Sequence, residues 1–142
     1  MTNELDTRPA PAPPPAAPTA PAGPTESIAD VAERTGVTAH TLRYYERIGL
    51  LNVARDHAGH RRYTPDDVDR VVFIARLRQT DMPIRDIQRY FDLVAQGPST
   101  EPERLALMMA QRDAVRAQLD ALQKALDVVE HKITLYGRGE GC

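Results

Sequence analysis

The chain has 142 residues, a formal charge of −2 and 42% hydrophobic residues, with two phenylalanines and no tryptophan. This length suits one small domain with an appendage, and the scarcity of large apolar side chains argues against one large globular core. The net charge gives no general attraction to polyanions, so any binding to nucleic acid would depend on a local cluster of basic residues.

The sequence also limits the compartment. A single cysteine, Cys142, cannot form an internal disulfide, which fits a reducing environment. No apolar run approaches the ~20 residues of a membrane span, and the N-terminus lacks the features of a signal peptide. We therefore expect a cytoplasmic protein with no membrane partner.

Residues 1–26 are rich in proline and alanine, and eight of the twelve prolines lie in this part of the chain. Such a segment has few backbone donors and almost nothing to bury. We predict a disordered tail biased towards polyproline II. A proline-rich docking segment is the alternative interpretation.

Two short helices are predicted next. Ser27 is a capping residue and Gly36 a stop signal, and Thr38 then caps a second helix that ends at Gly49. The few residues between them leave room only for a tight turn. This spacing is typical of a helix-turn-helix.

A small hairpin follows, because the periodicity changes after Leu51. Residues 53–55 and 60–63 can pair as two short strands around a turn at 56–59, where Gly59 can take a positive φ. Two short paired strands after a helix-turn-helix predict a wing.

Two longer helices complete the predicted 27–98 domain. Thr64-Pro65 opens the first and Met82-Pro83 interrupts the pattern. The second ends at Gly97-Pro98, and its expected apolar face comprises Ile84, Ile87, Tyr90, Phe91 and Val94.

From residue 101 to 136 the pattern is that of a coiled coil. Apolar residues step by three and four, interrupted only by Arg112. A lone helix of this length would leave its apolar seam in water, so we predict a homodimer; packing on its own N-terminal domain is the alternative. Residues 137–142 are expected to form a flexible tail. The predicted dimerisation residues are Leu105, Met108, Arg112, Val115, Leu119, Leu122, Leu126, Val129 and Ile133, with Tyr136 at the end of the seam.

The stretch from residue 38 to 63 carries five arginines against two acids. A helix with basic and hydroxyl side chains can enter the major groove while its flanks fix register on phosphates. We expect Leu42, Tyr45 and Ile48 to face the core in part, with Arg43 and Tyr44 facing outward. The predicted DNA-binding residues are Thr41, Arg43, Tyr44 and Arg47 on the helix, Arg55, Arg61, Arg62 and Tyr63 in the wing, and Arg85.

The run TAHTLRYYERIGLL, followed by ARDHAGHRRYTPDDVDRV and later by MPIRDI, resembles the DNA-binding domain of MerR-type transcriptional regulators. The resemblance covers about residues 27–94, and the heptad helix is similar to the family's dimerisation helix. It implies a mainly α-helical winged helix-turn-helix homodimer held by an antiparallel coiled coil. Such dimers bind palindromic operators in promoters with an overlong spacer, and they activate RNA polymerase by bending and untwisting the DNA. By this resemblance Arg43, Tyr44, Arg55, Arg61 and Tyr63 match positions at or near DNA, and Arg85 matches a second wing.

The closing EHKITLYGRGE resembles the short-tailed, non-metal-sensing branch of that family. One cysteine cannot form a thiolate metal site or hold an iron–sulfur cluster, so we predict no metal and no cofactor. Thr80 stands where a Cys or Ser is common, residues 50–54 lack the branch's reactive cysteine, and His131 is interpreted as a solvated helix residue. The small-molecule effector is therefore unassigned.

No nucleophile–base pairing, phosphate loop or metal-ligand spacing predicts an enzyme. We expect a nucleoid-associated, sequence-specific transcription regulator with double-stranded promoter DNA, a second copy and RNA polymerase as partners. An effector-independent architectural DNA-binding protein is the second interpretation, since we expect no sensor domain after the coil. A protein-interaction module built on the coil and the proline-rich tail is the third.

Overall fold

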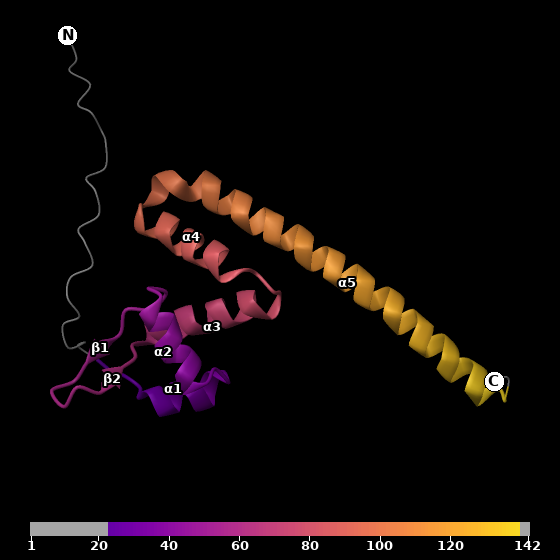
Figure 1. The fold of residues 1–142 in the computed structure, drawn as a ribbon, viewed down its shortest axis with the longest axis horizontal. Coiled ribbons are helices and arrows are strands. Elements are labelled where there is room, and N and C mark those ends of the chain that lie inside the picture. The colour runs from indigo at the N-terminus through magenta and orange to yellow at the C-terminus, as the bar shows by residue number, and fades with distance from the viewer. Residues whose placement is uncertain (1–22, 140–142) are drawn as a thin grey trace, which may run out of the picture. The chain divides into compact units, whose positions relative to one another are not determined.

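The computed structural model describes residues 23–139, which form two units divided after Arg104. Most of the predicted N-terminal tail and Cys142 lie outside the described residues. The fold is mainly α-helical, with one small hairpin (Figure 1). No helix in the described range is long and apolar enough to cross a membrane.

The helix-turn-helix is formed by α1 (Ile28–Thr35) and α2 (Ala39–Arg47). The hydroxyl of Ser27 accepts a hydrogen bond from a first-turn amide of α1, and that of Thr38 does the same for α2. Gly36 ends α1 with φ 75°, in the left-handed region that glycine adopts without steric cost. Local capping therefore fixes both helices where the sequence predicted them.

The wing pairs β1 (Ala54–Arg55) with β2 (Arg61–Arg62) in antiparallel register. Its turn is closed by the carboxylate of Asp56, which accepts hydrogen bonds from the amides of residues 58 and 60. These bonds stabilise the ionised carboxylate, so they hold the pKa of Asp56 below its usual value. Gly59 takes φ 83°, as predicted.

Both strands are shorter than predicted, because the residues at the base of the hairpin are used elsewhere. The N–H and C=O of Tyr63 bond to Glu26, at 2.8 and 2.9 Å. Val53, the residue expected to extend the first strand, is buried in the core. The ordered chain thus includes Glu26, within the stretch predicted as tail, which lies beside the end of the wing.

Helices α3 (Pro65–Gln79) and α4 (Ile84–Ala95) complete the first unit. Thr64 and Asp67 form a reciprocal capping box at the start of α3. The buried apolar residues of the unit include Val31, Leu42, Tyr45, Leu50, Leu51, Val53, Tyr63, Val68, Val71, Ile74, Met82, Ile87 and Leu93.

The face of α4 differs from the prediction. Leu93, which was not assigned to the apolar face, is buried, whereas only Ile87 of the five predicted residues is buried. Ile84 and Val94 are half-buried, and so are the two aromatic residues Tyr90 and Phe91. The two rings lie edge-to-face at 5.3 Å between centroids, and both contact Phe73 of α3. This aromatic cluster joins α3 and α4 near the surface.

A short 3₁₀ turn, η1 (Pro98–Thr100), leads into α5 (Glu101–Gly137), which has 37 residues. The hydroxyl of the buried Thr100 donates to the carbonyl of Leu93, so the turn is tied to α4. Within the single chain no residue of α5 is buried. Large apolar residues of its seam are exposed: Leu119 is 60% exposed and Leu122 is 67% exposed.

Candidate nucleic-acid interface

Helix α2 presents a polar and aromatic face to solvent. Leu42 is fully buried and Tyr45 is 5% exposed, whereas Arg43 is exposed and Tyr44 is 37% exposed. Burial also raises the pKa of the Tyr45 hydroxyl. The predicted division of this helix into an inward and an outward side is confirmed.

The outward residues of α2 are partly ordered by one another. The guanidinium carbon of Arg47 lies 5.7 Å from the centre of the Tyr44 ring, within the range of a cation–π contact. The hydroxyl of Thr41 accepts a hydrogen bond from Thr38 at 2.9 Å, which leaves its own proton available to an acceptor in solvent. Arginine, tyrosine and threonine donors thus lie on one exposed helix face.

One acidic side chain connects α2 to the wing. The carboxylate of Glu46 accepts from Arg61 at 2.5 Å and from Arg55 at 3.3 Å, one partner on each strand. The Glu46 side chain is only 20% exposed, and that of Arg61 is 24% exposed. Two charge-assisted hydrogen bonds to one carboxylate hold both strands at a fixed distance from the helix.

The role of Glu46 was not predicted from the sequence. There it is one of two acids among five arginines in the stretch 38–63. That isolated position is the signal that could have indicated an ion-pairing function, because an acid in a basic surface usually has a basic partner close by.

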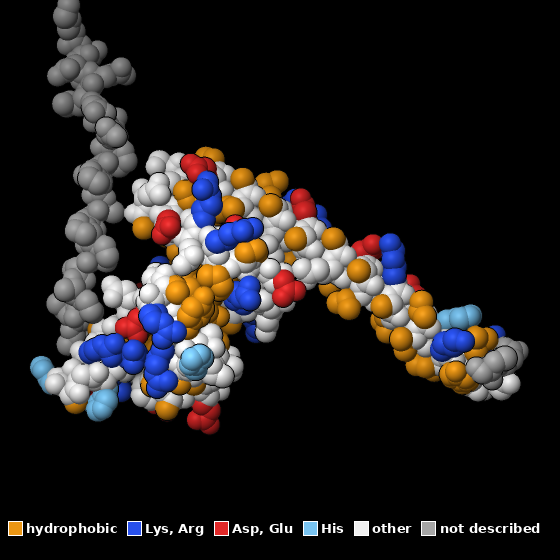
Figure 2. Space-filling view, viewed as in Figure 1, with side chains coloured by type: hydrophobic (Ala, Val, Ile, Leu, Met, Phe, Trp, Pro, Cys, Tyr) orange, Lys and Arg blue, Asp and Glu red, His pale blue; other side chains and the backbone are white. Residues whose placement is uncertain are grey.

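The remaining wing arginine is held from another direction. Arg62 donates from Nε to the hydroxyl of Thr25 and from Nη2 to its carbonyl, each at 2.9 Å. The segment before α1 therefore supports the second strand. Arginine side chains gather over α2 and the wing, with histidines at the edge of the same region (Figure 2).

The prediction for Tyr63 needs correction. Its side chain is fully buried, so it cannot contact DNA directly and instead supports the wing from within. Its hydroxyl forms no hydrogen bond to another described residue. Burial raises the pKa of this hydroxyl, and the nearby carboxylate of Glu46 raises it further.

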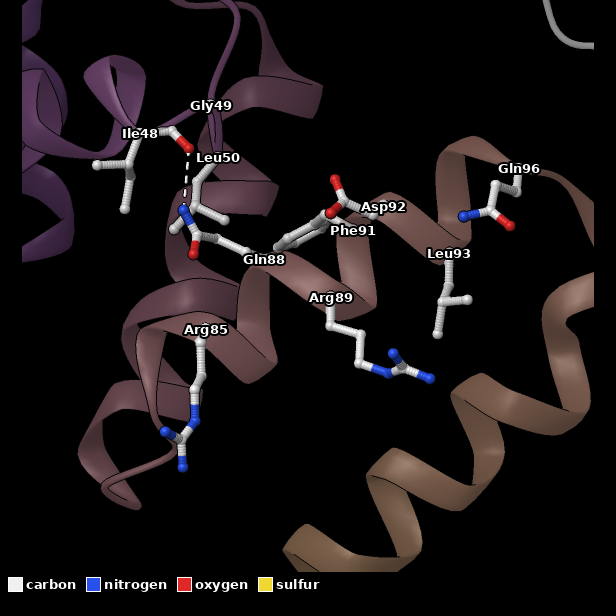
Figure 3. A pocket seen from close by; sticks show the side chains of 10 residues that line it. All are labelled: Ile48, Gly49, Leu50, Arg85, Gln88, Arg89, Phe91, Asp92, Leu93 and Gln96. Carbon is white, nitrogen blue, oxygen red and sulfur yellow. Dashed lines mark hydrogen bonds between the residues drawn. The ribbon is translucent and has the colours of Figure 1, made fainter.

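Helix α4 contributes Arg85 and a link to α2. Arg85 is exposed and lines a cavity of about 540 Å³ between α4 and residues 48–50 (Figure 3). Across this cavity the amide of Gln88 donates to the carbonyl of Ile48 at 3.1 Å. This bond, which sequence reasoning missed, fixes α4 against the end of α2 and so places Arg85 at a set distance from the exposed helix face.

The turn of the wing carries two exposed histidines, His57 and His60. Nδ1 of His60 lies 3.6 Å from the Asp56 carboxylate. Within residues 23–139, no three His, Cys, Asp or Glu side chains come together as a metal-binding group.

A winged helix-turn-helix with an exposed basic recognition helix defines a class of DNA-binding protein. Comparisons with known proteins give the family. Residues 27–93 match the family described as MerR HTH family regulatory protein, and residues 68–132 match MerR, DNA binding.

An HTH-type transcriptional regulator of Haemophilus influenzae is 37% identical over 117 residues, which cover 82% of this chain and 87% of the relative. One similar solved structure is HiNmlR, described as a MerR family regulator lacking the sensor domain and bound to promoter DNA. It is 37% identical to this chain, with a TM-score of 0.76. The match covers 80% of this chain and 87% of that one. A MerR family regulator of Listeria monocytogenes is 33% identical with a TM-score of 0.72, covering 79% and 86%.

The chain belongs to the MerR family of helix-turn-helix transcriptional regulators. It is a DNA-binding transcription regulator and not an enzyme. The resemblance stated from its sequence motifs is confirmed.

We predict that Glu46→Gln weakens specific DNA binding about tenfold, because losing a charge-assisted pair costs about 1–3 kcal/mol and leaves Arg55 and Arg61 unfixed. Binding to random DNA should stay equal or rise, since a negative charge leaves the interface. Gel shifts with specific and random duplexes measure both. Glu33→Gln, at an exposed position of α1, makes the same charge change away from the wing; an equal effect of both variants would refute a specific role for Glu46.

We predict that Tyr63→Phe leaves the free energy of unfolding unchanged or raises it by up to about 1 kcal/mol, because a buried hydroxyl without a partner is removed. DNA affinity should stay within about twofold. Urea unfolding and gel shifts test this, with Tyr44→Phe as the control for the unfolding measurement, because its tyrosine is exposed. A loss of affinity in Tyr63→Phe at unchanged stability would restore Tyr63 to the DNA-contacting residues.

Proposed function

We propose that the chain acts as a homodimer on a palindromic promoter operator and changes transcription by RNA polymerase through distortion of the DNA. The observation that supports this most is the exposed face of α2, which carries Arg43, Tyr44 and Arg47 beside an ordered basic wing. A sequence-specific binder needs such a face, because base edges are read by side chains on a helix in the major groove.

In this function the helix and the wing have different tasks. Arg43 and Tyr44 read base edges or fix the helix in the groove, with Thr41 and Arg47 close to them. Arg55, Arg61 and Arg62, which are already held by Glu46 and Thr25, supply positive charge to phosphates beside the groove. Arg85 extends the phosphate contacts from α4.

The exposed seam of α5 supports the dimer. A single helix with large apolar residues 47–67% exposed leaves a long apolar stripe in water. Burying it against a second copy recovers about 25 cal/mol per Å² of apolar surface. A dimer also accounts for a palindromic site, whose two half-sites lie about 34 Å apart when one DNA turn separates them.

Distortion of the DNA is proposed from the family. HiNmlR, at 37% identity, is described as bound to promoter DNA and as lacking the sensor domain. In the family mechanism, bending and untwisting bring two promoter elements into a spacing that polymerase can use. Deforming DNA costs a few kcal/mol, and contacts made only to the bent form must supply this energy.

We predict that Arg43→Ala and Tyr44→Ala each lower affinity for the operator by at least about tenfold, because each removes a contact worth about 1–3 kcal/mol. The operator is first obtained by sequencing the DNA recovered with the protein. Gel shifts measure affinity and sedimentation confirms an unchanged assembly. Arg76→Ala, at an exposed position of α3, is the matched control. Wild-type sequence-specific affinity in both variants would exclude α2 as the recognition helix.

A further prediction separates a ligand-controlled regulator from an effector-independent architectural protein. For a ligand-controlled regulator we expect the effect of the purified protein on in vitro transcription, from a promoter with an overlong spacer, to change when metabolite extract is added. We expect DNA circularisation to show the bend. If promoter output changes fully without any added metabolite, and metabolite extracts leave it unchanged, the architectural interpretation replaces the ligand-controlled one.

A further inference from the structure

The seam of α5 contains one residue that does not belong to an apolar stripe. Arg112 occupies a seam position between Met108 and Val115, and its side chain is 47% exposed. Its only ion pair within the described chain is to the adjacent Asp113, at 3.2 Å. Such an exposed pair is weak and easily exchanged for a better partner. The inference below rests on the proposed homodimer and concerns the residues that set its register.

The spacing of the seam residues allows a symmetric antiparallel pairing of two copies of α5. In the centred register, Leu119 lies beside the partner's Leu122, and each seam residue then lies opposite another seam residue. Because the two residue numbers of each pair have the same sum, one two-fold axis relates all of them, as an isologous interface requires. The five pairs are Leu105 with Tyr136, Met108 with Ile133, Arg112 with Val129, Val115 with Leu126, and Leu119 with Leu122.

Other registers lose contacts. Shifting the two helices by one heptad in either direction leaves two seam residues at one end of each chain without a partner position. These are Ile133 and Tyr136 for one shift, and Leu105 and Met108 for the other. Large exposed side chains such as Ile133, at 64% exposure, would then remain in water. The centred register buries the most apolar surface.

Charge selects the same arrangement. In a parallel dimer Arg112 would face its own copy, and two like charges would share one layer of the seam. In the centred antiparallel register, Arg112 lies level with the partner's Val129. The next residue, the partner's Glu130, lies on the same edge of the coil, about 1.5 Å further along the axis. A long arginine side chain leaving the seam on that edge meets this carboxylate.

We propose that Arg112 pairs with the partner's Glu130 twice per dimer, and that this pair fixes the register and orientation of the coil. A single charged residue within an apolar seam commonly has this function, at some cost in stability. Its value lies in excluding the parallel and shifted alternatives, in which the Arg112 charge would have no acidic partner or would face another arginine.

The first test reverses the charges. Arg112→Glu and Glu130→Arg are each expected to weaken the dimer at least tenfold in sedimentation equilibrium. The double variant should recover to within about threefold of wild type. Lys124→Glu reverses a charge on α5 outside the seam, where Lys124 pairs with Asp120 of the same chain, and should have little effect. Circular dichroism checks that each variant keeps its helix content. Failure of the double variant to recover, with the single variants folded, would overturn the pair.

The second test measures orientation without altering the proposed pair. A spin label is attached at His131→Cys in a Cys142→Ser background, and electron–electron distances are recorded on the dimer. The centred antiparallel register gives about 30–40 Å between labels, whereas a parallel dimer gives about 20 Å. A distance near 20 Å overturns the inference while leaving the homodimer intact. A monomer at all concentrations tested would instead refute the proposed homodimer itself.

Discussion

The ion-pair cluster at Glu46 is the interaction on which the proposed DNA-binding surface depends. It joins three segments, α2 and the two strands of the wing, through one carboxylate that accepts from Arg55 and Arg61. Without it, a hairpin with only two residues in each strand would have few contacts to fix its direction. The ion pairs to Glu46 therefore fix the position of the two strands relative to α2. The buried Tyr63 and Val53 attach the base of the wing to the core.

Much of the fold was predictable because its signals are local. Ser27, Thr38 and Thr64 each use a side-chain oxygen to accept a first-turn amide, and Gly36 ends α1 with a positive φ. These effects act within four residues, so they can be read from the sequence alone. The inward and outward sides of α2 followed from helical periodicity in the same way.

What the sequence did not reveal depends on contacts between distant residues. Arg62 bonds to Thr25, Gln88 bonds to Ile48, and the backbone of Tyr63 bonds to Glu26. No periodicity encodes these partners. From its place in the wing Tyr63 was expected to anchor the second strand, and from the family resemblance it was assigned to positions at or near DNA. Its complete burial agrees with the first expectation.

An acid within a DNA-binding surface reduces the attraction to phosphates, yet it also changes when the arginines are ordered. Fixing a free arginine side chain costs up to about 2 kcal/mol of rotamer entropy. Because Glu46 and Thr25 already hold Arg55, Arg61 and Arg62, a large part of this cost is met during folding and not on binding. In the proposed interface this arrangement favours discrimination between sequences over general affinity for DNA, which agrees with a chain whose formal charge is −2.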